Sequence, residues 1–150
     1  MRRKELVTFT NMCMIEDGHG NVALQERTGS WPGTAFPGGH VEFGESFTRA
    51  VIREVQEETG LTIVHPRLVA VKDWVNEDDS RYVVLLYRAN RFTGTLTSSS
   101  EGRVWWHPLD KLDEAGMRDS MRWMLQAFLD EDVSEHLLYE EDGEWKNILL

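Results

Sequence analysis

Apolar and polar positions along the first part of the chain follow a strand-like pattern. From Glu5 to Ile15 the residues are mainly β-branched, aromatic or thioether side chains. A turn-rich stretch, residues 16–21, separates this run from a second one at Val22 to Gln25. The pattern predicts a hairpin of two strands. Further on, Thr34 to Phe36 is predicted to be a short extended segment between two loops.

Two segments carry helical signals. Between Ser46 and Thr59 there is neither glycine nor proline, and Gly60 follows where a helix ends in a left-handed residue. From Ser120 to Leu129, Met121, Met124, Leu125 and Leu129 recur at helical spacing, so this second helix is expected to cover a sheet face. A short helical turn is predicted at residues 108–113.

The remaining runs predict strands. Leu61 to Val75, Arg81 to Asn90 and Arg103 to Trp106 are rich in β-branched and aromatic residues and are separated by polar loops. Together with the first strands they indicate a mixed sheet of at least five strands. The tail from Leu137 to Leu150 fits either a small terminal hairpin around Asp142-Gly143 or a loose end.

Composition narrows the class of protein. With 150 residues, 41% of them hydrophobic and 28% charged, the chain is expected to form one globular domain over residues 1–150. A net charge of −10 disfavours long nucleic acids and acidic membranes as partners. The single Cys13 excludes an internal disulfide, and we find neither a signal peptide nor a membrane span. These features favour a cytoplasmic protein. Its oligomeric state stays open, with a dimer among the options.

A cluster of acidic residues on the first helix carries the candidate chemistry. Glu54, Glu57 and Glu58 stand at i, i+3 and i+4, so three carboxylates share one face. Each such like-charge pair costs a solvated helix roughly 0.2 to 0.5 kcal/mol, and more as water is excluded. A hard divalent cation such as Mg²⁺, which prefers oxygen ligands and substrate phosphates, would offset that repulsion. The alternative is a solvated acidic face.

The residues around this face favour the metal-binding alternative. Pro37-Gly38-Gly39 offers a tight turn whose amides and carbonyls can approach a metal or a phosphate closely. Glu45 lies just before the helix, where a fourth carboxylate can fold toward the same ions. Arg53 lies four residues before Glu57 and is expected to pair with it.

These residues resemble the Nudix box, Gly-x5-Glu-x7-Arg-Glu-U-x-Glu-Glu-x-Gly-U, where U is bulky and apolar. The box is filled at each fixed position by Gly39, Glu45, Arg53, Glu54, Val55, Glu57, Glu58, Gly60 and Leu61. The resemblance implies an α/β/α sandwich with a mixed sheet between helices. It also implies hydrolysis of a nucleoside diphosphate linked to another group, with Mg²⁺ or Mn²⁺ as cofactor.

The resemblance also assigns roles to residues of this chain. Glu54, Glu57, Glu58 and the carbonyl of Gly38 are implied to be metal ligands, with Glu54 or a later carboxylate as the base and Arg53 orienting the set. Glu101, in the loop before the strand with two tryptophans, is implied to be a further ligand or base. Arg27, Phe36 and Gly39 are expected to contact substrate, although Arg27 and Glu101 also suit ordinary surface charges.

Candidates for holding the base are less specific. Aromatic rings can stack on a purine, and Trp31, Trp74, Trp105 and Trp106 are candidates besides Phe36. Thr8, Thr10 and Asn11 on the first strand are candidates for its polar edge. Each of these residues has an alternative role in packing or in ordinary strand polarity.

The overall likeness is to MutT-like enzymes that act on oxidised nucleotides such as 8-oxo-dGTP. The expected reaction is Mg²⁺-dependent hydrolysis of a nucleoside triphosphate to the monophosphate and pyrophosphate. Alternatives are a dinucleoside polyphosphate, ADP-sugar or RNA 5′-end hydrolase, or a Nudix module that binds nucleotide without catalysis. Val75 stands where ADP-ribose hydrolases carry proline, and Tyr82 lends the dinucleoside alternative some weight.

Overall fold

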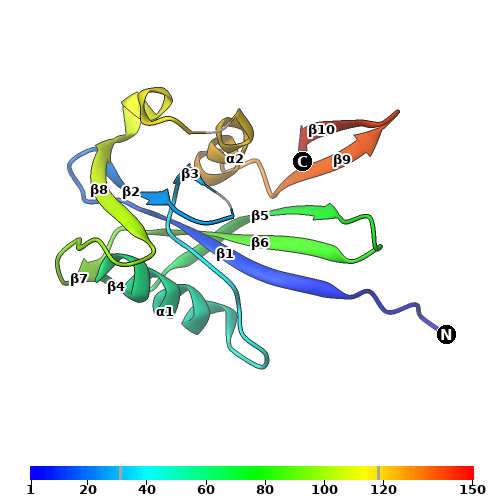
Figure 1. Ribbon diagram of the computed structural model, residues 1–150, viewed down its shortest axis with the longest axis horizontal. Helices are drawn as coiled ribbons and strands as arrows, with labels where there is room; N and C mark the ends of the chain where they lie inside the picture. Colours follow the sequence, from blue (N-terminus) through cyan, green and yellow to red (C-terminus); the bar gives the residue numbers. More distant parts are fainter. Residues whose placement is uncertain (31, 118) are drawn as a thin grey trace.

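A five-stranded mixed sheet runs through the computed structural model, which describes residues 1–30, 32–117 and 119–150 (Figure 1). Parallel pairs, β1 with β6 and β5 with β9, alternate with antiparallel ones, β6 with β5 and β9 with β10. Its strands, in spatial order, are β1 (Val7–Ile15), β6 (Arg81–Ala89), β5 (Arg67–Val75), β9 (Glu135–Glu141) and β10 (Glu144–Leu149).

Two smaller sheets complete the β structure of the described residues. One has the order β3-β2-β8, with β3 (Gly33–Ala35), β2 (Asn21–Arg27) and β8 (Gly102–Pro108) all antiparallel. The other pairs β4 (Thr62–Ile63) with β7 (Phe92–Thr93). Strand β8 leads into a 3-10 segment at Leu109–Ala115, which confirms the short helical turn.

The predicted hairpin of the first two strands is wrong. The strands β1 and β2 follow each other closely but lie in different sheets, and they meet through the isolated bridge between Glu16 and Val22. Consecutive residues of each strand are buried, Cys13 to Ile15 in β1 and Val22 to Gln25 in β2. Strands buried on both faces need partners on both faces, which two stacked sheets provide and a two-stranded hairpin does not.

The predicted strand from Leu61 to Val75 is two strands. Strand β4 ends at Ile63 and β5 starts at Arg67, in another sheet. Between them His65 has a φ of 51°, and Pro66 has no amide proton to donate to a neighbouring strand. The chain turns there and leaves one sheet for the next.

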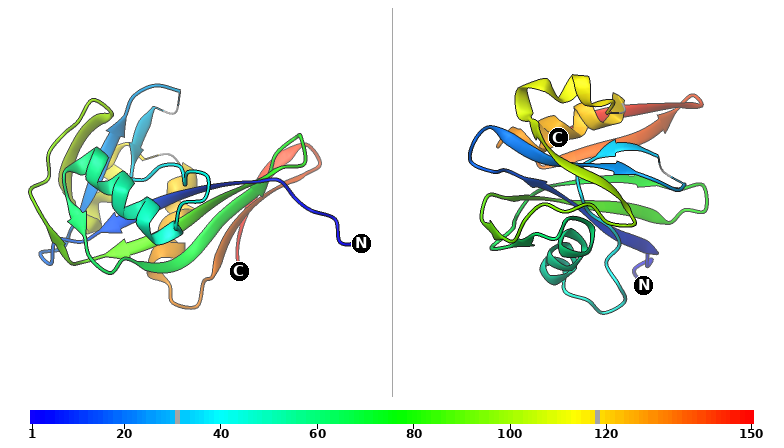
Figure 2. Two further views of the ribbon diagram at one scale, coloured as in Figure 1. Left: turned by 90° about the horizontal axis from the view of Figure 1, so that it is seen from below. Right: turned by 60° about the vertical axis from the view of Figure 1, so that its left-hand side comes forward.

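Helices cover both faces of the large sheet, as the right-hand view of Figure 2 shows. Helix α1 (Phe47–Thr59) is the predicted one. The Ser46 hydroxyl caps its start by accepting a hydrogen bond from the Arg49 backbone amide, and Gly60 ends it with a φ of 76°. Helix α2 (Asp119–Leu129) packs on the opposite face, where Met121, Met124 and Phe128 are buried. The expected α/β/α arrangement is confirmed, and none of the described helices is long and apolar enough to cross a membrane.

The C-terminal segment is ordered as a hairpin. Strands β9 and β10 pair antiparallel around the turn at Asp142 and Gly143, and β9 adds to the large sheet beside β5. This confirms the hairpin over the loose tail. His136 on β9 has no exposed surface, so the hairpin is anchored where it joins the sheet.

Phe36 belongs to the core between the large sheet and α2. It has no exposed surface, and its ring meets that of Phe128 edge-on with 5.1 Å between centroids. A nucleobase has no access to a ring enclosed in this way. The expectation that Phe36 contacts substrate is therefore wrong, because the segment before Pro37 passes through the interior.

We predict that Phe36→Ala destabilises the protein by about 3 to 5 kcal/mol, the usual cost of deleting a buried phenyl ring. Urea unfolding followed by circular dichroism measures this cost. Phe43→Ala is the matched control, because Phe43 is fully exposed and its loss should change the unfolding free energy by less than about 0.5 kcal/mol. A cost for Phe36→Ala below about 1 kcal/mol would contradict the core assignment.

Candidate active site

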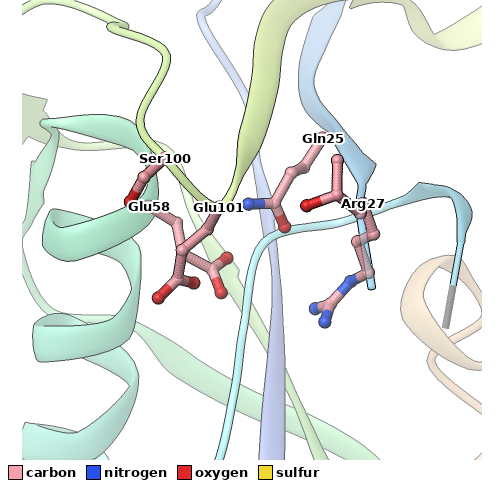
Figure 3. Close-up of a pocket in the computed structure, with 6 residues that line it drawn as sticks. Gln25, Arg27, Glu58, Ser100 and Glu101 are labelled. Atoms are coloured by element: carbon pink, nitrogen blue, oxygen red, sulfur yellow. The ribbon is translucent and has the colours of Figure 1, made fainter. Parts of the chain in front are cut away.

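Three carboxylates from two separate segments converge beside α1. Glu54 and Glu58 lie one turn apart on α1, and Glu101 comes from the loop before β8. One carboxylate oxygen of each lies within 4.8 Å of the others. Figure 3 shows the side chains of Glu58 and Glu101 pointing toward each other across the gap between helix and loop. Glu58 is only 3% exposed, whereas Glu101 is exposed, so the pair lies where a buried acid meets the solvent-facing loop.

A tight turn holds Glu101 in position. The Ser99 and Gly102 backbones hydrogen-bond each other, and the Glu101 amide donates to the Ser99 hydroxyl at 3.2 Å. Gly102 has a φ of 146°, and a Cβ there would lie 2.1 Å from the carbonyl oxygen of Glu26. Glycine is therefore required for β8 to pair closely with β2. This close pairing fixes the backbone position of the preceding residue, Glu101.

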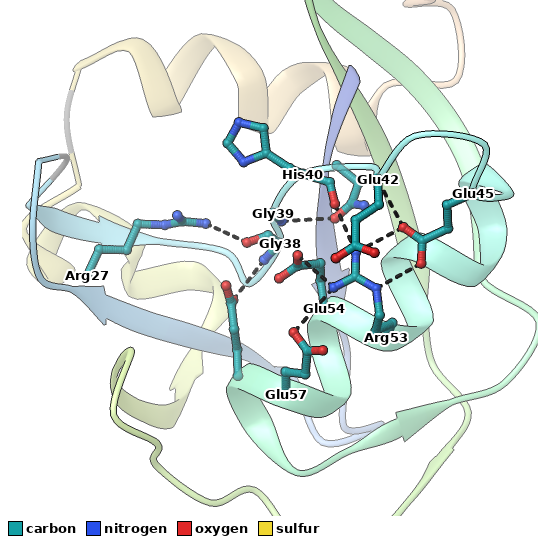
Figure 4. A network of polar contacts seen from close by, with 11 residues as sticks. Arg27, Gly38, Gly39, His40, Glu42, Glu45, Arg53, Glu54 and Glu57 are labelled. Atoms are coloured by element: carbon teal, nitrogen blue, oxygen red, sulfur yellow. Dashed lines mark hydrogen bonds and ion pairs between the residues drawn. The ribbon is translucent and has the colours of Figure 1, made fainter. Parts of the chain in front are cut away.

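The Gly38–Gly39 turn lies between β1 and α1 (Figure 4). The Gly38 amide donates to Glu58 Oε2 at 3.0 Å, and the Gly39 amide donates to Asn11 Oδ1 at 3.1 Å. A Cβ on Gly39 would lie 2.4 Å from the Glu54 carboxylate. Gly39 was expected to bind substrate, whereas in this structure its lack of a side chain makes room for a carboxylate of the cluster.

Arg27 and the Gly38 carbonyl, both expected at the site, contact each other. Arg27 Nη2 donates to the Gly38 oxygen at 3.0 Å, so the predicted phosphate-binding cation meets the predicted metal-ligating carbonyl. The two groups lie beside the carboxylate cluster. In this arrangement the Gly38 oxygen is already occupied by a hydrogen-bond donor.

Arg53 is the centre of a polar network on the outer side of the same helix (Figure 4). Both oxygens of Glu45 accept from it, at 2.8 and 2.9 Å, and Glu54 accepts at 3.0 Å. The expected pair with Glu57 is confirmed at 3.3 Å. Glu45 was expected to fold toward the ions, whereas in this structure both oxygens of its carboxylate are bound to Arg53.

Glu57 lies outside the three-carboxylate cluster. Its side chain is 49% exposed, and its contact in this structure is with Arg53. Of the three acids predicted on one helix face, the structure thus brings Glu54 and Glu58 together with Glu101, and it leaves Glu57 at the rim. The difference arises because the i+4 residue faces the loop before β8, whereas the i+3 residue faces solvent.

The pKa values of Glu54 and Glu58, in the carboxylate cluster, shift in the opposite direction to that of Glu45, which is bound to Arg53. Burial raises the pKa of Glu58 to about 8 and outweighs the lowering by the Gly38 amide and by Arg27, while the nearby Glu54 and Glu101 carboxylates add smaller rises. Burial also raises the pKa of Glu54. In contrast, hydrogen bonds from Arg53 lower the pKa of Glu45 to about 2. Negative charge in the inner cluster is therefore unfavourable unless a cation joins it.

A cavity of about 290 Å³ opens beside the cluster. Its lining consists of Gln25, Arg27, Thr28, Glu58, Ser100 and Glu101. Gln25 is a residue that the sequence analysis missed. It is only 1% exposed, and the available signal was its amide at the end of an otherwise apolar run that begins at Val22.

The candidates for base binding are scattered. Trp74 stacks on Tyr82 with 4.5 Å between centroids, and Trp106 packs against Phe92. Trp105 lies under the guanidinium of Arg103. These rings have neighbours of their own in the fold, and Trp31 lies outside the described residues.

The polar candidates on β1 serve the fold in this structure. The Thr10 hydroxyl donates to the Val83 carbonyl at 3.0 Å, and Asn11 holds the Gly39 turn. Thr8 is exposed. Asn11 thereby contacts the turn that borders the carboxylate cluster.

Comparison with known proteins identifies the family. The NUDIX domain model matches residues 9–128. An uncharacterized Nudix hydrolase of Bacillus subtilis, YvcI, is 32% identical over 111 residues, covering 70% of this chain and 68% of that protein. The chain therefore belongs to the Nudix hydrolases, enzymes that cleave phosphoric anhydride bonds and generally use divalent metal ions.

Two further proteins indicate which members of the family this chain resembles. An oxidized purine nucleoside triphosphate hydrolase of Danio rerio is 28% identical over 121 residues, covering 77% of this chain and 75% of that protein. The crystal structure of a MutT protein from Bacillus halodurans superimposes with a TM-score of 0.78 at 26% identity, covering 95% of this chain and 97% of that one.

We predict that metal-free protein loses stability as pH rises from about 5 to about 8 and that Glu58→Gln flattens this decline. Folded Glu58, with its pKa near 8, keeps a proton that the unfolded chain has already released, so folding becomes less favourable across that window. The difference amounts to on the order of a few kcal/mol. Urea unfolding in a chelator at several pH values measures it.

The control for this experiment is Glu131→Gln, which removes an exposed carboxylate in the loop after α2. It should keep the wild-type dependence on pH. Equal slopes for wild type and Glu58→Gln would show that Glu58 is not the group that titrates.

Proposed function

We propose that this Nudix hydrolase uses Mg²⁺, or Mn²⁺ in its place, to hydrolyse a nucleoside triphosphate to the monophosphate and pyrophosphate. We further propose an oxidised purine nucleotide such as 8-oxo-dGTP as its substrate. The observation that carries the proposal is the convergence of Glu54, Glu58 and Glu101, whose carboxylate oxygens lie within 4.8 Å of one another. The domain that acts would be residues 1–150 as one unit.

The residues of the cluster fit a hard divalent cation. All the donors are carboxylate oxygens, the ligands that Mg²⁺ and Mn²⁺ prefer, and they include no thiolate or imidazole. Burial is the main cause of the raised pKa values of Glu54 and Glu58, and a cation bound beside them would favour their ionised forms. Glu54 and Glu58 would hold the ion from α1, and Glu101 would face it from the opposite side as the base.

In this proposal each residue has a task in the attack of water on phosphorus. Arg53 fixes Glu54 at 3.0 Å, and the Gly38 amide fixes Glu58, so that both ligands are preorganised. Glu101, on the loop side, takes the proton of the attacking water. A divalent cation held by these carboxylates would supply charge neutralisation for the polyphosphate and would make the attacking water more acidic. Arg27, at the cavity wall, would contact the phosphate chain.

Support for the substrate comes from the relatives. The Danio rerio protein carries the name of an oxidized purine nucleoside triphosphate hydrolase, and it aligns over 77% of this chain. The Bacillus halodurans structure is named as a MutT protein and matches nearly the whole chain. Both point to a small nucleotide as the substrate class.

A second candidate is a capped RNA end. The NAD-capped RNA hydrolase NudC of Mycobacterium tuberculosis is 38% identical over 65 residues, although the match spans only 20% of that protein. The net charge of −10 disfavours a long polyanion. We therefore rank this substrate, together with dinucleoside polyphosphates and ADP-sugars, below the nucleoside triphosphate.

We predict that Glu58→Gln lowers kcat by about 100-fold or more at saturating Mg²⁺, since it removes a buried ligand charge while keeping the side-chain shape. Glu57→Gln should lower kcat by less than about 10-fold, because Glu57 lies at the rim on Arg53. Steady-state pyrophosphate release measures both, with circular dichroism to confirm folding. Glu114→Gln, an exposed position, is the control. A Glu57→Gln loss as large as that of Glu58→Gln would place Glu57 in the metal set.

We predict that 8-oxo-dGTP gives the highest kcat/KM in a panel with dGTP, a dinucleoside polyphosphate, ADP-ribose and NAD-capped RNA. Phosphorus NMR should identify the products as nucleoside monophosphate and pyrophosphate. A higher kcat/KM for capped RNA or for ADP-ribose would replace the proposed substrate, while leaving the metal-dependent chemistry in place.

A further inference from the structure

The C-terminal hairpin is attached to the large sheet through a short joint. Strand β9 pairs with β5 over three residues of each strand, Glu135 to Leu137 against Val71 to Asp73. At the start of the joint the Val71 amide donates to the Ser134 carbonyl at 3.0 Å. Figure 1 shows β9 and β10 at the edge of the sheet, beyond β5. With so few backbone pairs, side-chain contacts across the joint matter for holding the hairpin in place.

Two acidic side chains meet at this joint. Because Val71 lies opposite Glu135 in parallel strands, Asp73 is the next residue of β5 on the same face, diagonally across from Glu135. The Glu135 carboxyl group lies against that of Asp73, close enough for a shared hydrogen bond. Asp73 is only 4% exposed, so the contact is made away from bulk water. Two ionised carboxylates in that setting would repel each other.

One oxygen of Asp73 lacks a donor within the described part of the chain. The other oxygen, Oδ2, accepts from Arg81 Nη1 at 2.8 Å, and Arg81 Nε donates to Glu5 at 3.0 Å. Asp73 Oδ1 is buried and has no hydrogen-bond partner. An ionised Glu135 cannot supply a donor, because a carboxylate only accepts, whereas a protonated carboxyl group has an O–H to donate. Asp73 Oδ1 is therefore satisfied when Glu135 carries a proton.

We propose that Glu135 and Asp73 share one proton and that this proton holds the β9–β10 hairpin on the large sheet. The proton sits on Glu135, its O–H donates to Asp73 Oδ1, and Arg81 balances the single remaining negative charge. In agreement with this arrangement, the hydrogen bond with Asp73 and burial raise the pKa of Glu135 to about 7, against an opposing effect of Arg81. Once the proton is lost, two carboxylates face each other beside one arginine, and the joint weakens.

Two further titratable groups lie on the other face of the same joint. Lys72 and His136 are paired across the strands, and burial lowers the pKa of both, that of Lys72 to about 8. Glu135, with its raised pKa, stabilises the joint fully below about pH 4.5, and this contribution is lost as pH rises to about 7. His136 acts in the opposite direction, because its contribution is lost as pH falls below about 6.5. Lys72 titrates above this range. Variants at Glu135 isolate the first effect, since His136 is common to all of them.

Amide hydrogen exchange at the joint, measured by NMR, tests the proposal with Glu135→Gln. Glutamine keeps the shape of the side chain and carries an N–H donor for Asp73 at every pH. We compare the protection of the Val71 amide in the variant with that in wild type. The ratio should lie within a few-fold of one at pH 5 and should be larger by about 10- to 100-fold at pH 7.5, because Glu135 has then lost its proton in wild type.

Two controls accompany this measurement. Glu140→Gln changes an exposed carboxylate of the same strand and should keep the wild-type dependence on pH. The Val64 amide, which donates to the Arg91 carbonyl at 2.9 Å away from the joint, should show no rise in the Glu135→Gln comparison. A ratio that stays constant across pH at Val71 would refute the shared proton. An equal rise at Val64 would refute its local role in holding the hairpin.

Carbon-13 NMR of the side-chain carboxyl groups locates the proton directly. In wild type the Glu135 signal should titrate with a midpoint near 7. In Asp73→Asn, where an amide N–H can donate to an ionised Glu135, the midpoint should fall by about 2 pH units or more. A wild-type midpoint at the ordinary value for glutamate would overturn the proposal. Neither experiment requires turnover, so the outcome does not depend on the proposed hydrolytic function.

Discussion

Repulsion among closely placed carboxylates is the constraint on which this structure depends. Glu54 and Glu58 would separate if their positions were free, but the Gly39 backbone lies against one carboxylate and the Gly38 amide donates to the other. The two glycines thus hold an arrangement that is unfavourable without a cation. Such preorganisation means that little rearrangement is needed when an ion and a polyphosphate arrive.

The arginines divide the acidic residues into two groups with different electrostatic roles. Arg53 is bound to Glu45 and Glu57, so these outer charges are compensated within the protein, and it also contacts Glu54 at the edge of the inner group. The inner group receives less compensation: Arg27 reaches the Gly38 carbonyl, and Glu58 keeps a raised pKa. The buried Glu58 therefore holds a proton in the metal-free protein near neutral pH, and a divalent cation bound beside the cavity would replace that proton.

The fold brings the loop that carries Glu101 to the helix that carries Glu54 and Glu58. The end of α1 is tied to the loop before β8, since the Thr97 amide donates to the Thr59 carbonyl at 2.8 Å. Gly94 lies so close to this helix end that a Cβ would be 2.7 Å from the Gly60 oxygen. The segment that carries Glu101 is thereby fixed to the helix that carries Glu58. Because β8 pairs with β2, the same arrangement places Gln25 on the facing wall.

The sequence by itself determined the local features: the helix from Ser46 with its end at Gly60 and the acidic helix face follow from short-range spacing and propensity. For the C-terminal segment it left a hairpin and a loose end open, and the pairing of β9 with β5 and β10 decided for the hairpin. Tertiary structure alone decided that β1 and β2 join different sheets, that Phe36 is enclosed, and that Glu101 rather than Glu57 meets Glu58. The physical reason is that burial and strand partners depend on contacts between residues far apart in the chain. An amphipathic pattern shows which side chains share a face, but not which neighbour covers that face.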